Sequence, residues 1–197
     1  MDETIKVYEE FAEEYDEISG NKLDDVVNHL RFFLETIEGD DILDLGCGSG
    51  RDAEWFSEKG KNVVGIDLSE NLLDIAKKKA PNAVFNKMDI RNLGFEKEDF
   101  DGIWASGSIH HITKDEAETV LEELHHILKH QGLLYVSVKK GKGERYVRDG
   151  RIEEGKRFFS FYEEDELNKL ISKAGFEIIK SEHDSEWIVL FAKKIPS

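Results

Sequence analysis

Glycines and carboxylates follow one another in this sequence at a spacing that suits an adenosyl cofactor. The apolar run 42–45 contains Asp44, and a helical segment begins soon after it, at Arg51. Between them lie Gly46, Gly48 and Gly50, which let the backbone turn tightly and approach a ligand. A second apolar run ends in Asp67, at about the distance from the glycines at which a carboxylate binds the two hydroxyls of a ribose.

The glycine spacing also bears on which adenosyl cofactor is bound. A dinucleotide fingerprint reads G-x-G-x-x-G, whereas here the order is G-x-G-x-G and Arg51 stands at the position of the third fingerprint glycine. Asp44 would repel a pyrophosphate and attract a ligand that carries an ammonium and a sulfonium. The pattern favours such a ligand, but a nicotinamide dinucleotide stays open because Asp67 would also suit its ribose.

Composition bounds the class of protein. The chain has 197 residues, 39% hydrophobic and 36% charged, which indicates one soluble globular domain. A net charge of −16 argues against nucleic-acid binding, which needs a broad basic surface. No apolar run reaches membrane-span length and the N-terminus is acidic, so we expect no membrane segment, no signal peptide and a cytoplasmic location. A single cysteine excludes an internal disulfide, and no metal site is predicted.

Hydrophobic periodicity predicts alternating strands and helices. Two helices, 7–18 and 21–37 with Asn21 as a cap, precede the first strand. Strands follow near 42–46, 62–67, 83–88, 101–105 and 132–139, and helices near 51–59, 70–79, 115–129 and 163–174, with Gly132 read as a helix stop. The last two strands, 176–182 and 186–193, are joined by three residues and must be antiparallel.

The glycine loop and this layout resemble the class I S-adenosylmethionine (SAM)-dependent methyltransferases, loosely those of the tellurite-resistance type. The resemblance implies an α/β fold: a Rossmann-like, doubly wound, mostly parallel sheet with helices on both faces and a C-terminal antiparallel β-hairpin. It divides one domain, 1–197, into an N-terminal helical cap at 1–40, a cofactor-binding core at 41–138, a substrate-side insertion at 139–162, and a final helix and hairpin at 163–197.

The resemblance also implies a SAM site. In the family, an acidic residue such as Asp89 reads the adenine amino group, and Met88 and Ile90 would cover the ring. Tyr15 would close over the ligand, or else serve as a core aromatic; Arg51 would approach the methionine carboxylate, or else be solvated. The full predicted set is Tyr15, Asp44, Gly46, Cys47, Gly48, Gly50, Arg51, Asp67, Leu68, Met88, Asp89, Ile90, Ala105 and Ser106; no chemistry is assigned to the Cys47 thiol.

The segment after the fourth predicted strand contains the candidate catalytic residues His110 and His111. Imidazole titrates near neutral pH, so either ring is a candidate general base; the alternative is that one packs and the other bonds a backbone carbonyl. The motifs that the family uses to methylate adenine, glutamine or cytosine C5 are absent here. O-, N-, S- or metalloid methylation of a small molecule remains.

The segment 139–157 carries eight basic and four acidic residues, in contrast to the acidic segment before the first strand. We predict that Arg145, Arg148 or Arg157 contacts an anionic group on a small acceptor. The alternative is a solvated loop that balances an acidic surface. A non-catalytic SAM-binding module that regulates a partner through the N-terminal helices is also open, and the oligomeric state is not indicated.

Overall fold

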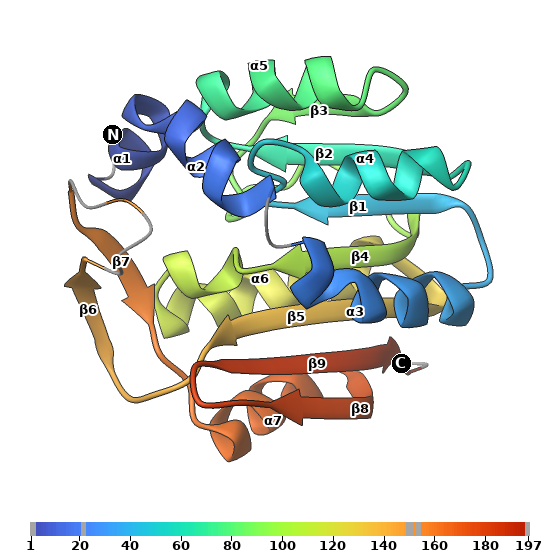
Figure 1. Cartoon of the computed structure of the whole chain (residues 1–197). Helices are drawn as coiled ribbons and strands as arrows, with labels where there is room; N and C mark the ends of the chain where they lie inside the picture. Colours follow the sequence, from blue (N-terminus) through green and yellow to red (C-terminus); the bar gives the residue numbers. More distant parts are fainter. Residues whose placement is uncertain (1–2, 21–22, 149–151, 153–154, 196–197) are drawn as a thin grey trace.

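A computed structural model describes residues 3–20, 23–148, 152 and 155–195. Its centre is a seven-stranded sheet in the order β3-β2-β1-β4-β5-β9-β8, with the five strands from β3 to β5 parallel and β9 antiparallel to both its neighbours (Figure 1). The predicted doubly wound sheet with a C-terminal hairpin is confirmed. The strands are β1 (Asp41–Leu45), β2 (Asn62–Asp67), β3 (Val84–Lys87), β4 (Phe100–Ser106), β5 (Leu128–Lys139), β8 (Phe176–His183) and β9 (Trp187–Lys194).

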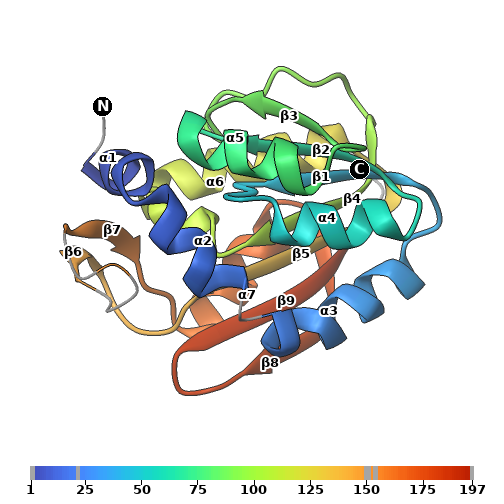
Figure 2. The same cartoon turned by 45° about the horizontal axis from the view of Figure 1, so that its top comes forward.

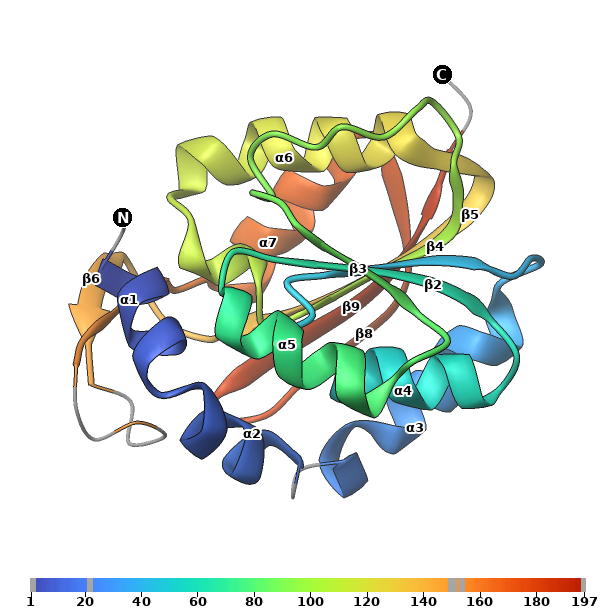
Figure 3. The same ribbon diagram turned by 90° about the horizontal axis from the view of Figure 1, so that it is seen from above.

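Helices cover both faces of the sheet. α6 and α7 lie on one face, and α3, α4 and α5 lie on the other (Figure 3). The described helices are α1 (Glu3–Glu10), α2 (Ala12–Gly20), α3 (Leu23–Thr36), α4 (Arg51–Glu58), α5 (Glu70–Lys79), α6 (Lys114–Ile127), α7 (Glu164–Lys173) and the 3-10 turn η1 (Ile109–His111). None of these helices is long and apolar enough to cross a membrane.

Each face of the sheet packs into its own apolar core. Along β5, Leu134 and Val136 pack with α6 and α7, while Leu133 and Tyr135 pack with α3 and α4. Because both faces of β5 are buried, its sequence is largely apolar instead of alternating between apolar and polar residues. In the second core, the ring of Trp104 stacks on Tyr135 with centroids 3.6 Å apart.

Two predicted boundaries are wrong. The helix expected over 7–18 is broken at Phe11 into α1 and α2. Gly132 does not end a helix, because β5 begins directly after α6 and Gly132 lies inside the strand. The pairing of β5 with β4 shifts register over this stretch, and Gln131 takes a φ of 63° there. The predicted cap Asn21 lies outside the described residues.

The insertion contains a small antiparallel sheet that periodicity did not predict. It is formed by β6 (Glu144–Val147) and β7 (Arg157–Ser160). Figures 1 and 2 show it beside α1, at the end of the central sheet toward which the parallel strands point. Helices α1 and α2 lie along the same end, so the cap and the insertion together border the edge where open α/β sheets bind ligands.

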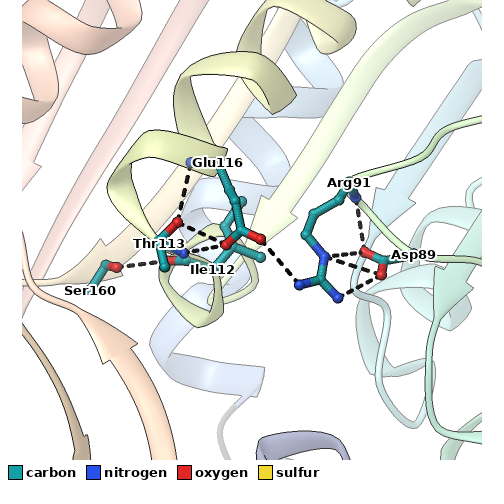
Figure 4. Close-up of polar contacts among 6 residues, drawn as sticks. All are labelled: Asp89, Arg91, Ile112, Thr113, Glu116 and Ser160. Carbon is teal, nitrogen blue, oxygen red and sulfur yellow. Dashed lines mark hydrogen bonds and ion pairs between the residues drawn. The ribbon is translucent and has the colours of Figure 1, made fainter. Parts of the chain in front are cut away.

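The start of α6 offers a test of local stability. The Thr113 hydroxyl accepts a hydrogen bond from the Glu116 backbone N–H at 3.3 Å, and the Glu116 carboxylate accepts one from the Thr113 backbone N–H at 2.8 Å (Figure 4). Thr113→Ala removes this capping box and should lower the free energy of unfolding by about 1 kcal/mol in urea denaturation. Ser57→Ala is the control, because the Ser57 hydroxyl donates to the Glu54 carbonyl within α4. An equal effect of both substitutions would contradict the capping role.

Candidate functional site

Two adjoining cavities open where β1, β2 and β4 end. The larger has a volume of about 570 Å³ and the smaller about 100 Å³. Five residues line both cavities and mark the junction between them: Tyr8, Tyr15, Gly46, Ser106 and Gly107. Parallel pairing of β1 with β2 brings the glycine loop after β1 next to the end of β2.

The glycines of the loop have different roles. A Cβ on Gly46 would stand 2.5 Å from the Cβ of Ser108, and one on Gly48 would stand 3.3 Å from the ring of Tyr15. Both positions have positive φ, 72° and 53°, which glycine adopts without strain. Gly50 lines neither cavity; a Cβ there would stand 2.7 Å from the Cβ of Ala76 on α5. Gly46 and Gly48 thus let Ser108 and Tyr15 approach the loop closely, whereas Gly50 lets the loop pack on a helix.

Asp67 lies in the wall of the smaller cavity beside Leu68. Its carboxylate accepts hydrogen bonds from the backbone N–H groups of Gly48 at 3.0 Å and Ser69 at 2.9 Å. Burial raises the pKa of Asp67 in spite of these bonds. The two bonds fix the carboxylate against the glycine loop, and the role of Asp67 toward a ribose stays a prediction.

Asp44 lies in the wall of the larger cavity and is buried. Burial, and after it the negative charge of Asp52, raise the pKa of Asp44 well above its ordinary value. One of its carboxylate oxygens has no hydrogen-bond partner among the described residues. A buried acceptor of this kind is costly unless a ligand donates to it.

Arg51 lines the same cavity as Asp44. Its guanidinium donates to the Asp52 carboxylate at 2.7 Å and to the Ser19 carbonyl at 3.2 Å. The larger cavity therefore has an unsatisfied carboxylate oxygen and a guanidinium in its wall. Asp44 and Arg51 are the groups in this wall that could hold the ammonium and the carboxylate of a zwitterion. The Arg51 guanidinium is already paired with both oxygens of Asp52.

The residues expected at the adenine, Met88, Asp89 and Ile90, line the smaller cavity. The Asp89 carboxylate accepts from the guanidinium of Arg91 at 2.7 Å, and Arg91 also reaches Glu116 at 3.2 Å (Figure 4). Partial burial acts to raise the pKa of Asp89, but the bonds and charge of Arg91 outweigh it and hold the pKa below its usual value. Asp89 is thus a fixed, ionised acceptor.

Two other predicted cofactor residues lie differently from one another. Ala105 lines neither cavity and packs in the core beneath α6, whereas its neighbour Ser106 lines both.

Cys47 borders the larger cavity, and burial raises the pKa of its thiol well above the usual value. The Cys47 side chain is therefore a neutral wall of the site.

The two histidines have defined partners. The buried ring of His110 lines the larger cavity, and its Nδ1 accepts from the Lys139 backbone N–H at 3.2 Å, so the proton of the neutral ring is on Nε2. His111 lines the smaller cavity, and its Nδ1 lies 2.7 Å from the Phe158 carbonyl, which can only accept. The proton of neutral His111 is therefore on Nδ1, and its Nε2 accepts from the Tyr8 hydroxyl at 2.9 Å.

Tyr8 is the site residue that sequence reasoning missed. It lines both cavities, and its ring lies edge-on to Tyr15 with centroids 5.1 Å apart. In the sequence it belongs to an amphipathic stripe with Val7, Phe11 and Tyr15, and nothing in that stripe separates it from a core aromatic. Only the hydroxyl distinguishes Tyr8 from Phe11.

The three arginines predicted for an anionic acceptor do not share a site. Arg157 lines the larger cavity, is 2% exposed, and donates to the Tyr8 hydroxyl at 2.7 Å. Arg148 lines a separate hollow of about 270 Å³. Arg145 lies over the ring of Phe161 at 3.9 Å and donates to the Lys142 carbonyl. No group of three or more His, Cys, Asp or Glu side chains within the described residues could hold a metal ion.

Comparisons with known proteins agree with this architecture. Residues 42–132 match the family model described as a methyltransferase domain. An uncharacterized methyltransferase of Oceanobacillus iheyensis is 30% identical over 138 residues, which are 67% of this chain and 65% of that protein. The chain thus spans just under two thirds of that relative's length.

Solved structures share the fold. A SAM-dependent methyltransferase from Clostridium acetobutylicum superposes with a TM-score of 0.74 at 21% identity, covering 95% of this chain and 98% of that one. A Burkholderia thailandensis 1,6-didemethyltoxoflavin-N1-methyltransferase, solved with 1,6-didemethyltoxoflavin and S-adenosylhomocysteine, has a TM-score of 0.66 at 22% identity, covering 93% and 90%. With the glycine loop and the strand order, these matches show that the chain belongs to the class I SAM-dependent methyltransferases, whose cofactor is SAM.

Asp44→Asn should separate ligand binding from stability. The raised pKa of Asp44 means that the folded state holds the proton more tightly than the unfolded chain. Stability without ligand therefore rises as the pH falls through that raised pKa, and Asp44→Asn should abolish this rise.

The same substitution should weaken S-adenosylhomocysteine binding roughly tenfold to a hundredfold in calorimetry, because a charged partner of the ammonium is lost. Asp74→Asn is the control, since Asp74 is exposed and pairs with Lys77 on α5. Unchanged affinity in Asp44→Asn would contradict the assignment of Asp44 to the ligand's ammonium.

Proposed function

We propose that the chain transfers the sulfonium methyl group of SAM to a small, anionic acceptor by direct displacement. The observation that carries the proposal is the junction of the two cavities at Ser106 and Gly107. In this proposal the smaller cavity holds the adenosine, and the larger cavity, which His110 and Arg157 also line, holds the methionine part and the acceptor. The bound cofactor supplies an already activated methyl group, and the residues around it align the acceptor and exclude water.

A small acceptor fits the dimensions of the site. A volume of about 570 Å³ is within the usual range of small-molecule pockets, and it must hold part of the cofactor as well. The solved Burkholderia methyltransferase has a small heterocycle as its bound ligand, which supports the same size class. The net charge of −16 supports a partner other than nucleic acid.

The anionic character of the acceptor rests on Arg157. Lys139 lines the same cavity, with its ammonium 4.5 Å from the Trp187 ring and 3.0 Å from Glu186. Two cations in the wall favour a carboxylate or phosphate on the acceptor. His110 is proposed to contact the acceptor through Nε2 as a donor. Arg145 and Arg148, outside the cavity wall, are left with the role of balancing the acidic surface.

Turnover of labelled SAM with a panel of small acceptors tests the proposal. We expect methylated product when a suitable acceptor is present, and only slow consumption of SAM when no acceptor is added. Binding of S-adenosylhomocysteine without turnover of any acceptor would instead support a non-catalytic SAM-binding module. Hydride exchange with NAD and no response to SAM would support the oxidoreductase alternative.

Arg157→Gln should change the choice of acceptor. Wild type should show a lower KM for carboxylate acceptors than for the corresponding amides, and Arg157→Gln should raise the KM for the carboxylates by roughly tenfold, because a charge-assisted hydrogen bond is lost. Affinity for S-adenosylhomocysteine should not change. Arg148→Gln, in the separate hollow, is the matched control. An unchanged preference for carboxylates in Arg157→Gln would show that Arg157 does not contact the acceptor.

A further inference from the structure

A hydrogen-bonded chain runs from a buried arginine through a tyrosine to a histidine at the junction of the cavities. The Arg157 guanidinium donates to the Tyr8 hydroxyl at 2.7 Å, and the Tyr8 hydroxyl lies 2.9 Å from His111 Nε2. His111 Nδ1 donates to the Phe158 carbonyl at 2.7 Å. This chain joins three elements that are far apart in sequence: α1, η1 and β7.

The donor and the acceptor of each hydrogen bond follow from the two groups at the ends of the chain, the Arg157 guanidinium and the Phe158 carbonyl. Arginine can only donate and a carbonyl can only accept, so the Tyr8 oxygen accepts from Arg157 and donates its own proton to His111 Nε2. The guanidinium next to the Tyr8 oxygen stabilises the negative charge that forms on this oxygen as its proton moves to His111. A phenol held between a cation and an accepting imidazole is arranged to lose its proton to the imidazole.

The position of Tyr8 lets it reach an acceptor. It lines both cavities together with Ser106 and Gly107, whereas His111 lines only the smaller of the two. Its ring is fixed by edge contacts to Tyr15 and to His111, with centroids 5.1 and 5.5 Å away. α1 is itself held at β7, where the Phe158 backbone N–H donates to the Thr4 hydroxyl at 2.8 Å. Phe158 therefore orients both ends of the Tyr8–His111 pair.

We propose that Tyr8 is a catalytic residue that takes the proton of a hydroxyl acceptor while its own phenolic proton moves to His111. This inference rests on the proposed methyl transfer and names the class of acceptor. The acceptor oxygen bonds to the methyl carbon as the carbon–sulfur bond breaks, and that electron pair stays on sulfur. The released proton ends on His111 Nε2 and leaves to solvent after the product. Atoms and charge balance, and no further reactant is needed.

The kinetic test compares a hydroxyl with a thiol acceptor of the same shape. The probes are hydroxybenzoate and mercaptobenzoate at mildly alkaline pH, where the thiol is already ionised. Tyr8→Phe should lower kcat for hydroxybenzoate by roughly a hundredfold, the usual effect of general-base catalysis, and lower kcat for mercaptobenzoate less than threefold. Its affinity for S-adenosylhomocysteine should match wild type. Equal losses with both probes, or no loss with hydroxybenzoate, would overturn the proposal.

Tyr146→Phe is the matched control. It makes the same chemical change on β6, where Tyr146 is 46% exposed and packs edge-on against Phe158 outside both cavities. Its kcat should equal that of wild type with both probes. His111→Gln should reproduce the selective loss of Tyr8→Phe.

Nitrogen NMR of the His111 ring tests the same chain without turnover. The proton at neutral pH should be on Nδ1, and Tyr8→Phe should shift the Nε2 resonance because that nitrogen loses its donor. A proton on Nε2, or a resonance unchanged by Tyr8→Phe, would overturn the proposal even if wild type methylates neither probe. Absence of turnover with every acceptor would count against the proposed function alone.

Discussion

Two carboxyl groups at the ends of adjacent parallel strands are the constraint on which the rest of the site depends. Asp44 in β1 is buried and Asp67 at the end of β2 is half-buried, and desolvation raises the pKa of each. The loop after β1 satisfies Asp67 through Gly48 but leaves one oxygen of Asp44 without a partner among the described residues. Under our assignment, the ammonium of the cofactor donates to this oxygen, and the cost of burying Asp44 is offset only when such a ligand is bound.

The same edge of the sheet is closed by segments from opposite ends of the fold. α1 is anchored on one side by Glu9, which bonds Ser69 at 2.5 Å and Asn71 at 2.8 Å on the α5 side. On the other side it is anchored to β7 through Thr4. Tyr8 therefore stands between the cofactor residues and the insertion, and the hydrogen bonds of Arg157 and His111 meet at its hydroxyl. The proton transfer that we propose therefore depends on the position of one short helix, α1.

Local patterns predicted most of this fold. The central strands are continuous apolar runs because both faces of the sheet are covered, and the short 183–185 connection required an antiparallel pair. Asp44, Asp67 and the glycines could be identified from spacing, since a strand, a turn and a helix are local. The role of Gly50 could not, because its contact with Ala76 joins two helices that the sequence does not relate.

The rest of the site depends on contacts across the chain. Tyr8 is separated from its partners by about half the sequence or more, and periodicity assigns it only to an apolar stripe. In the sequence Arg157 is one of several cations of the insertion. In the structure it is buried against Tyr8 of α1, while Arg145 and Arg148 stay exposed. A charge count in sequence cannot separate a buried arginine from two exposed ones.

Calorimetric titration with S-adenosylhomocysteine, with NAD as the competing ligand, tests the central claim most directly. The two carboxylates predict binding in the micromolar range, about −8 kcal/mol, loss of that binding in Asp67→Ala, and no heat with NAD. Binding of NAD by wild type, with no response to S-adenosylhomocysteine, would contradict the assignment of the glycine loop and of both carboxylates.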